Sequence, residues 1–389
     1  MQKVLSIMLS SLKPVALAMA AALATAAPAQ AETKFLLTFL DGTSDIERAA
    51  FTQAAANWSA LLSTDITVNL AVGTAPMAPS VLGSAAGSIV RMQYRNVRTA
   101  LETHATSATD AIAVANLPAG NNLPLLINGT SNNPNGQASF VPYLDNTGIN
   151  TSSMKMTSAN SRALDLVPYL NIVTRPANCI GTNCDGVITL NSNASWDLTP
   201  EDGITPGTFD FIGTAMHEIA HTLGFVGGVD MLDSSIANVN NAPSNSLYAD
   251  DNFVNVMPLD LYRCSAASAA QSALDWTAGT NTGDRFFAID GCDTSLGSLS
   301  TGERWGDGRQ VSHWKESGAD LGLMNPTAPL GQPLLLKQRD LVAIDAIGWN
   351  LASTTVAAST VATPAPASAL VFAMGLAGLV PLRRRATTA

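Results

Sequence analysis

The sequence is poor in charged residues, and in basic residues above all. Only 13% of its 389 residues are charged, and 20 Lys and Arg stand against 30 Asp and Glu. This shortage of positive charge argues against nucleic acid as a partner, because binding to phosphates requires a basic surface. The hydrophobic fraction of 47% instead predicts a folded chain with a substantial core, arranged as one large domain or two subdomains.

Cysteine is scarce as well, since the chain has four and none lies in residues 32 to 178. Four cysteines allow three pairings. In an oxidising compartment the two local pairings are favoured, Cys179 with Cys184 and Cys264 with Cys292. The alternative is that one or more of these cysteines stay free.

The first 31 residues have the pattern of a secretory signal peptide. Lys3 and Lys13 precede an apolar run of Ala, Leu and Met in residues 14 to 27, and Ala29-Gln30-Ala31 places small residues at a cleavage site. We therefore expect an exported protein whose mature chain begins near Glu32.

Histidine is also rare, yet two of the four histidines fall in one short motif, MHEIAHTLGF, at residues 216 to 225. On a helix, His217 and His221 are one turn apart, so both imidazoles leave the same face and can bind one zinc ion. Glu218 lies beside them and can take a proton from a water molecule on the metal. The alternative is a buried helix whose two histidines are satisfied by hydrogen bonds.

The residues around the motif predict the helix that carries it. Asp210 or Thr208 can cap its first turn, and Gly224 supplies its end. Apolar residues recur at three- and four-residue steps and give the helix a buried face: Phe211, Ile212, Ala215, Met216, Ile219 and Leu223.

Upstream of the motif, the hydrophobic pattern predicts a βαβ opening, with a strand at residues 35 to 39, a helix at 45 to 62 and a strand at 66 to 72. Residues 74 to 160 are rich in Ala, Ser, Asn, Gly and Pro and do not place individual elements. His104 lies in this stretch without a spacing relation to the other histidines. We interpret it as a surface or structural residue and not as a metal ligand.

Residues 187 to 191, VITLN, predict a β-branched strand that ends about two dozen residues before the motif. Such a strand could hold an extended peptide through its backbone groups, as a protease cleft requires. The alternative is an ordinary interior strand.

Beyond Gly224 the sequence resembles a known family. The pattern HExxHxxGF, a long insertion, His313 followed by Trp314, and then Met324-Asn325-Pro326 resemble the leishmanolysin-type metzincins and related bacterial surface metallopeptidases. The resemblance covers roughly residues 186 to 349. It implies these roles: zinc ligands His217, His221 and His313, the catalytic acid/base Glu218, and a Met-turn at Met324 beneath the metal.

The third zinc ligand lies far from the HExxH motif in the sequence. A compact metzincin would carry it at position 227, which is Gly227 here. A catalytic zinc needs three protein ligands and an open position, and His313 is the one imidazole left downstream of the motif. Asp230 is the alternative ligand.

Clustered carboxylates suggest a second cation. Asp250 and Asp251, and the aspartates of residues 290 to 293, could bind calcium. The alternative is that these loop carboxylates are merely solvated.

The C-terminal residues change in composition twice. Residues 351 to 362 form an Ala/Thr/Val linker, and residues 363 to 389 resemble a PEP-CTERM sorting signal, with Pro364-Ala365-Pro366, an apolar run at 367 to 382 and the cluster Arg383-Arg384-Arg385. The resemblance implies an exosortase-type sorting enzyme as a partner and transient anchoring in the membrane. The alternative is a plain C-terminal anchor.

Together these patterns predict an α+β, metzincin-like zinc protease domain at residues 32 to 350, with two subdomains divided after about residue 224. An N-terminal mixed sheet with helices would include the zinc helix, and a C-terminal subdomain would hold the Met-turn and a closing helix at residues 334 to 349. We expect a secreted, surface-sorted zinc endopeptidase that acts on a protein or peptide substrate. The alternatives are a zinc-stabilised, non-catalytic envelope or matrix protein and a hydrolase of non-peptide bonds.

Overall fold

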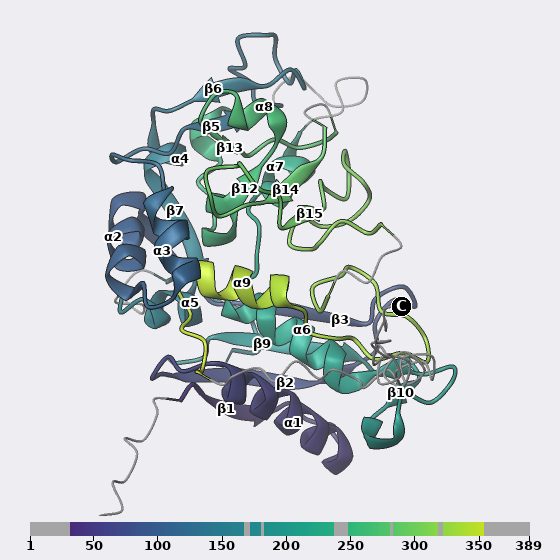
Figure 1. Cartoon of the computed structure of the whole chain (residues 1–389). Coiled ribbons are helices and arrows are strands. Elements are labelled where there is room, and N and C mark those ends of the chain that lie inside the picture. Colours follow the sequence, from purple (N-terminus) through teal and green to yellow (C-terminus); the bar gives the residue numbers. More distant parts are fainter. Residues whose placement is uncertain are drawn as a thin grey trace, which may run out of the picture. The chain divides into compact units, whose positions relative to one another are not determined.

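The computed structural model describes residues 32–166, 172–179, 183–236, 248–280, 283–317 and 322–353. The predicted signal peptide, the sorting tail and most of the linker lie outside this range. The described residues form a mixed α+β fold with several small sheets and nine α-helices, which agrees with the predicted α+β class (Figure 1). No helix among them is long and apolar enough to span a bilayer.

The helices are mostly short. They are α1 (Asp45–Leu61), α2 (Tyr94–His104), α3 (Ala108–Ala115), α4 (Ile149–Ser152), α5 (Ser158–Ala163), α6 (Phe211–Leu223), α7 (Val229–Ser235), α8 (Ala266–Ala269) and α9 (Gln338–Ala346).

The largest described sheet has four strands in the order β1-β2-β9-β3. These are β1 (Lys34–Phe39), β2 (Thr67–Ala75), β9 (Gly186–Asn191) and β3 (Gly83–Gly87). The first three are parallel, whereas β3 runs antiparallel to β9 and forms an edge of the sheet. The predicted βαβ opening is confirmed, since α1 connects the parallel strands β1 and β2.

Strand β9 is the strand predicted at residues 187 to 191, and it is an interior strand. Both of its edges are already paired, one with β2 and one with β3. The interpretation that this strand holds a peptide is therefore wrong, because its backbone groups are used within the sheet. The edge strand beside β9 is β3, in the stretch where the sequence placed no element.

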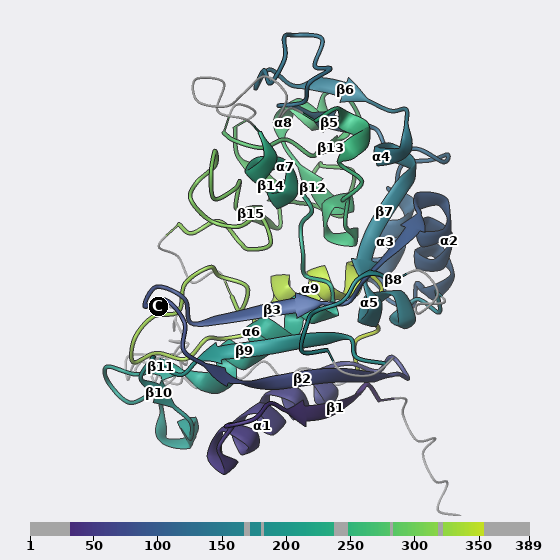
Figure 2. The same ribbon diagram turned by 180° about the vertical axis from the view of Figure 1, so that it is seen from behind.

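Helices α1 and α6 pack on one face of this sheet (Figure 1), and Figure 2 shows the opposite face. The ring of Phe51 on α1 meets the ring of Phe211 on α6 edge to face, with centroids 4.9 Å apart. The indole N–H of the fully buried Trp58 donates to the backbone oxygen of Met216 at 2.9 Å. These contacts hold the predicted zinc helix against the βαβ unit.

Both predicted ends of α6 are present. Its N-cap is Asp210, whose carboxylate accepts the N–H of Gly213 at 2.8 Å. Gly224 ends the helix with φ +116°, in the left-handed region where a side chain would be strained.

The remaining described sheets are small. They are β10-β11 (Trp196–Asp197, Phe209–Asp210), β12-β14-β15 (Arg263–Cys264, Arg285–Phe287, Gly297–Leu299), β13-β5-β6 (Leu274–Asp275, Leu125–Ile127, Tyr143–Asp145) and β7-β4-β8 (Ser153–Thr157, Ile89–Gln93, Ile172–Thr174). One hydrophobic cluster includes side chains from α1 through to Trp349, after α9.

The closing helix is shorter than predicted. The sequence predicted a helix at residues 334 to 349, but α9 spans only Gln338–Ala346. The reason is that Lys337 is the N-cap of the helix: its backbone is extended, with φ −114° and ψ 163°, and its N–H donates to the Asp340 carboxylate. At the other end, Gly348 has φ +104°, which a right-handed helix does not allow. The inward positions of Leu341 and Ile344 are as predicted, since both side chains are buried.

The two local disulfides are confirmed. Cys179 pairs with Cys184, and Cys264 pairs with Cys292, with Cα–Cα distances of 5.3 and 5.6 Å. The second bond closes a loop within the long insertion that separates the HExxH motif from His313.

Candidate metal centre

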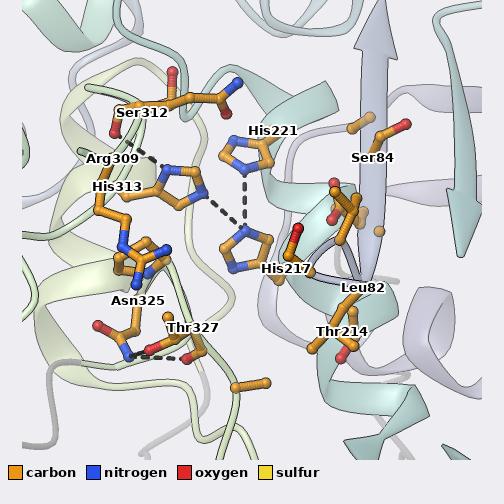
Figure 3. Close-up of a pocket in the computed structure, with 18 of the residues that line it drawn as sticks. Leu82, Ser84, Thr214, His217, His221, Arg309, Ser312, His313, Asn325 and Thr327 are labelled. Carbon is orange, nitrogen blue, oxygen red and sulfur yellow. Dashed lines mark hydrogen bonds between the residues drawn. The ribbon is translucent and has the colours of Figure 1, made fainter. Parts of the chain in front are cut away.

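Three of the four histidines meet at one point. His217 and His221 come from successive turns of α6, and His313 precedes Trp314, which forms an antiparallel bridge with Leu299 at the end of β15. Figure 3 shows the three rings turned toward one another. The Nε2 atom of His217 lies 3.1 Å from that of His221 and 3.2 Å from that of His313. Among the described residues, this is the one group of three His, Cys, Asp or Glu side chains whose ligand atoms all lie within 4.8 Å of one another.

Each ring is oriented from behind by a backbone oxygen. The Nδ1 atom of His217 lies 2.8 Å from the oxygen of Leu323, and that of His221 lies 2.8 Å from the oxygen of Phe225. For His313 the partner is the backbone oxygen of Gln310, at 3.2 Å. A carbonyl oxygen can only accept, so each ring places its N–H on Nδ1. Such carbonyl partners are typical of histidines that bind metals through Nε2.

The lone pairs of the three Nε2 atoms therefore face one another. A neutral imidazole has one N–H, already used at Nδ1, so no Nε2 atom can donate to its neighbour. Burial lowers the pKa of His217 to about 4, and burial followed by the charge of His217 lowers that of His221 to about 3. Near neutral pH these rings are therefore neutral, and their Nε2 atoms carry no proton that could be donated. The alternative interpretation, in which hydrogen bonds satisfy both motif histidines, accounts for their Nδ1 atoms but leaves their Nε2 atoms without a donor.

The spacing of the nitrogens suits a small tetrahedral cation. Zinc binds imidazole nitrogen at about 2.0–2.1 Å, so two tetrahedral ligands stand about 3.3 Å apart. The observed separations of 3.1 and 3.2 Å are close to that value. Imidazole nitrogen suits zinc, as it also suits copper, iron and nickel. The residues present thus fit the zinc ion that the sequence predicts.

The histidines lie in the wall of a cleft of ≈ 740 Å³. One side of the cleft is formed by residues 79 to 85, which lead into and include β3, and the other by residues 308 to 313 and 325 to 328. Helix α6 contributes Thr214, Glu218 and the two motif histidines. The centre is therefore open to the cleft and not closed within the core.

Glu218 follows His217 on α6 and also lines this cleft. Its side chain is buried, and burial raises its pKa to about 8. The carboxylate lies against β3, because a Cβ atom placed on Gly83 would be 2.5 Å from Glu218 Oε1. The absence of a side chain at Gly83 thus leaves room for the predicted catalytic carboxylate.

Backbone groups of β3 point into the same region. Asn191 N donates to Leu82 O, and Ser88 N donates to Asp185 O, so the even-numbered residues bond to β9. Since bonding alternates along an antiparallel pair, Gly83 and Ala85 turn their N–H and C=O groups away from β9. The described residues place no further strand on that edge.

The other candidate ligands do not join the triad. Asp230 lines the cleft, but its Oδ1 accepts the N–H of Val311 at 2.9 Å, and burial raises its pKa to about 7. Asp230 therefore supports the segment that carries His313. His104 ends α2 and lies 3.4 Å from Asp165, away from the triad, in keeping with a structural or surface role.

The carboxylates considered for calcium are engaged by protein donors. Asp250 accepts the hydroxyl of Tyr143 at 3.0 Å, and Asp251 accepts the N–H of Ile149 at 2.7 Å. Asp290 accepts the N–H of Thr294 at 2.9 Å. Calcium binding remains a prediction without a ligand cluster in the described part of the chain.

Sequence reasoning missed three contributions to this centre. It did not place β3, because the run GSAAG is made of small residues that also fit a loop. It did not identify the backbone oxygens behind the rings, since any residue can supply one. It also missed Asp340, whose carboxylate accepts the N–H of Leu323 behind His217, because no sequence motif marks this residue.

Comparisons with protein-family models, with curated proteins and with solved structures find no match to this chain. The function is therefore argued from the geometry of the centre.

Proposed function

We propose that this chain is a zinc-dependent endopeptidase. The observation that carries the proposal is the convergence of three Nε2 lone pairs on the wall of a cleft that also holds Glu218. Catalytic zinc sites use three protein ligands and keep a position for water or substrate, whereas structural sites are closed by four. Three imidazoles facing a cleft match the first arrangement.

Each residue then has a distinct role. His217, His221 and His313 would hold the ion through Nε2, with their orientation set by the three backbone oxygens. When bound, zinc supplies Lewis acidity, which polarises a carbonyl group and lowers the pKa of water. A nearby positive charge favours the ionised form of a carboxyl group, so with zinc bound Glu218 would accept a proton from the attacking water and pass it to the leaving amine.

The edge strand β3 supports a peptide as the substrate. The outward N–H and C=O groups of Gly83 and Ala85 match those of an extended chain, which would bind as an added strand without being read for sequence. Such a chain would pass Glu218, which packs against Gly83. A non-peptide substrate would leave these backbone groups unused.

Metal analysis combined with digestion of a peptide library tests the proposal. We expect one zinc ion per chain, and cleavage that a chelator abolishes and added zinc restores. Zinc without cleavage of any peptide would favour the non-catalytic envelope protein. Cleavage of esters alone would favour a hydrolase of another bond, and a chain that binds no zinc would refute all three.

We also propose that the protein is exported and sorted to the cell surface. The proposal rests on residues 1 to 31 and 363 to 389 of the sequence, and the two disulfides suit an oxidising compartment outside the cytosol.

Mass spectrometry of the chain isolated from outside the cell tests this export pathway. We expect an N-terminus near Glu32 and a C-terminus shortened within the tail. Cells that lack the sorting enzyme should retain the chain in the membrane with its C-terminus intact. An exported chain that still ends at Ala389 would contradict the sorting proposal.

A further inference from the structure

One buried carboxylate lies behind the candidate metal centre and accepts four N–H groups. Asp340, on α9, is 1% exposed. Its Oδ1 accepts the indole N–H of Trp314 at 2.7 Å and the backbone N–H of Met324 at 3.2 Å. Its Oδ2 accepts the backbone N–H groups of Leu323 at 2.9 Å and Lys337 at 2.7 Å.

Two of these donors are directly connected to zinc-site histidines. The backbone oxygen of Leu323 is the group that orients His217, at 2.8 Å from its Nδ1. Trp314 follows His313 in the chain, and its backbone N–H donates to the oxygen of Met324 at 3.0 Å. The carboxylate of Asp340 therefore joins the segment that carries His313 to the turn that holds the ring of His217.

The residues around this carboxylate pack closely against it and its partner Trp314. Gly322 has φ +111°, and a Cβ atom there would overlap Asp340 Oδ2. The fully buried ring of Trp314 packs edge to face against Phe225 and Phe287, with centroids 5.3 and 5.9 Å away. The indole N–H consequently points at Asp340, and no solvent competes for it.

We infer that Asp340 is a positioning residue for the metal centre, which fixes the backbone of Leu323 behind His217 and the indole of Trp314 beside His313. The inference rests on the proposed zinc site. Groups hydrogen-bonded directly to metal ligands typically change metal affinity by 10–100-fold when they are removed, and Asp340 acts one residue further out, through Leu323 and Trp314. A residue that only caps α9 would change the stability of the fold and leave zinc affinity unaltered.

Substitution Asp340→Asn tests this role with little change in shape. The amide NH₂ cannot accept, so about half of the four donors lose their acceptor. We expect the dissociation constant for zinc, measured against a competing chelator, to rise about 10-fold, at the low end of the range for direct partners of a ligand. We also expect a changed visible absorption spectrum of the cobalt-loaded chain, which reports ligand geometry independently of catalysis.

The matched control is Asp345→Asn on the same helix. Asp345 is 2% exposed and accepts the hydroxyl of Ser107, on another part of the fold. This variant should keep the zinc affinity and cobalt spectrum of the wild type, even if its thermal midpoint falls.

A second variant, Trp314→Phe, removes one donor and keeps an aromatic ring. It should raise the zinc dissociation constant less than Asp340→Asn and alter the cobalt spectrum, and it decides the question if Asp340→Asn does not fold. Wild-type zinc affinity and an unchanged spectrum in the folded variants would overturn the role of Asp340 and leave the proposed function intact. A wild-type chain that binds no zinc would instead refute the proposed function, and this inference with it.

Discussion

Replacing Glu218 by glutamine is expected to lower kcat for peptide hydrolysis by about 10²–10⁴-fold, the range that a positioned acid/base contributes. The amide has the size of the carboxylate but cannot take a proton from water or pass one to the leaving amine. Zinc should remain bound, because the three imidazoles are unchanged. Initial rates at saturating peptide, together with metal analysis of the same samples, measure both quantities.

The control for this experiment is Glu201→Gln, an isosteric change at an exposed position outside the cleft. It should leave kcat unchanged. Full turnover by a zinc-loaded Glu218→Gln chain would end the acid/base role.

A substitution on β3 tests the position of the Glu218 carboxylate without changing Glu218 itself. Gly83→Ala would place a Cβ atom 2.5 Å from Glu218 Oε1 and force it to move, so turnover should fall while zinc stays bound. Gly87→Ala in the same strand is the matched control, since its nearest neighbour would be Thr157 Cγ2 at 3.2 Å.

His313→Ala is expected to weaken zinc binding by more than about 100-fold. Loss of a group that merely orients a ligand already weakens binding by 10–100-fold, and this change removes one of the three ligands. Activity should be lost even when excess zinc restores part of the binding, because the remaining two imidazoles no longer fix the ion against the cleft. Competition with a chelator gives the affinity of each variant.

Two controls separate ligand loss from other effects. Asp230→Ala removes the acceptor for Val311 N–H but no Nε2 lone pair, so it should weaken zinc binding far less than His313→Ala does. His104→Ala removes the histidine beside Asp165 and should change nothing at the centre. Equal zinc affinity of His313→Ala and the wild type would refute the three-histidine centre and leave Asp230 as the next candidate.

The parts of this protein that the sequence predicted well depend on short-range chemistry. The αL end of α6 at Gly224 and its cap at Asp210 follow from backbone and side-chain preferences within one turn. The parallel β1–α1–β2 unit follows from hydrophobic periodicity. The cysteine pairs are close in sequence, at separations of 5 and 28 residues.

The sequence-based predictions of structure were wrong where a residue far along the chain decides how a segment folds. The segment before α9 is held by Asp210, 124 residues earlier, whose carboxylate accepts the N–H of Leu334. The interior position of β9 is decided by β3, which lies about a hundred residues earlier and whose small residues resemble a loop. Periodicity cannot show which strand pairs with which.

By itself, the sequence determined that His217 and His221 share one helix face with Glu218 beside them, because the helix repeat places residues four apart on one side. It also identified His313 as the candidate for the third ligand, because His313 is the one histidine after the motif. Only the tertiary structure decided that the Nε2 atom of His313 comes within 3.2 Å of His217 across 96 residues of chain. The tertiary structure alone decided which backbone oxygens orient the three rings and that the Asp340 carboxylate lies behind Leu323. Such long-range hydrogen bonds depend on packing and leave no local pattern in the sequence.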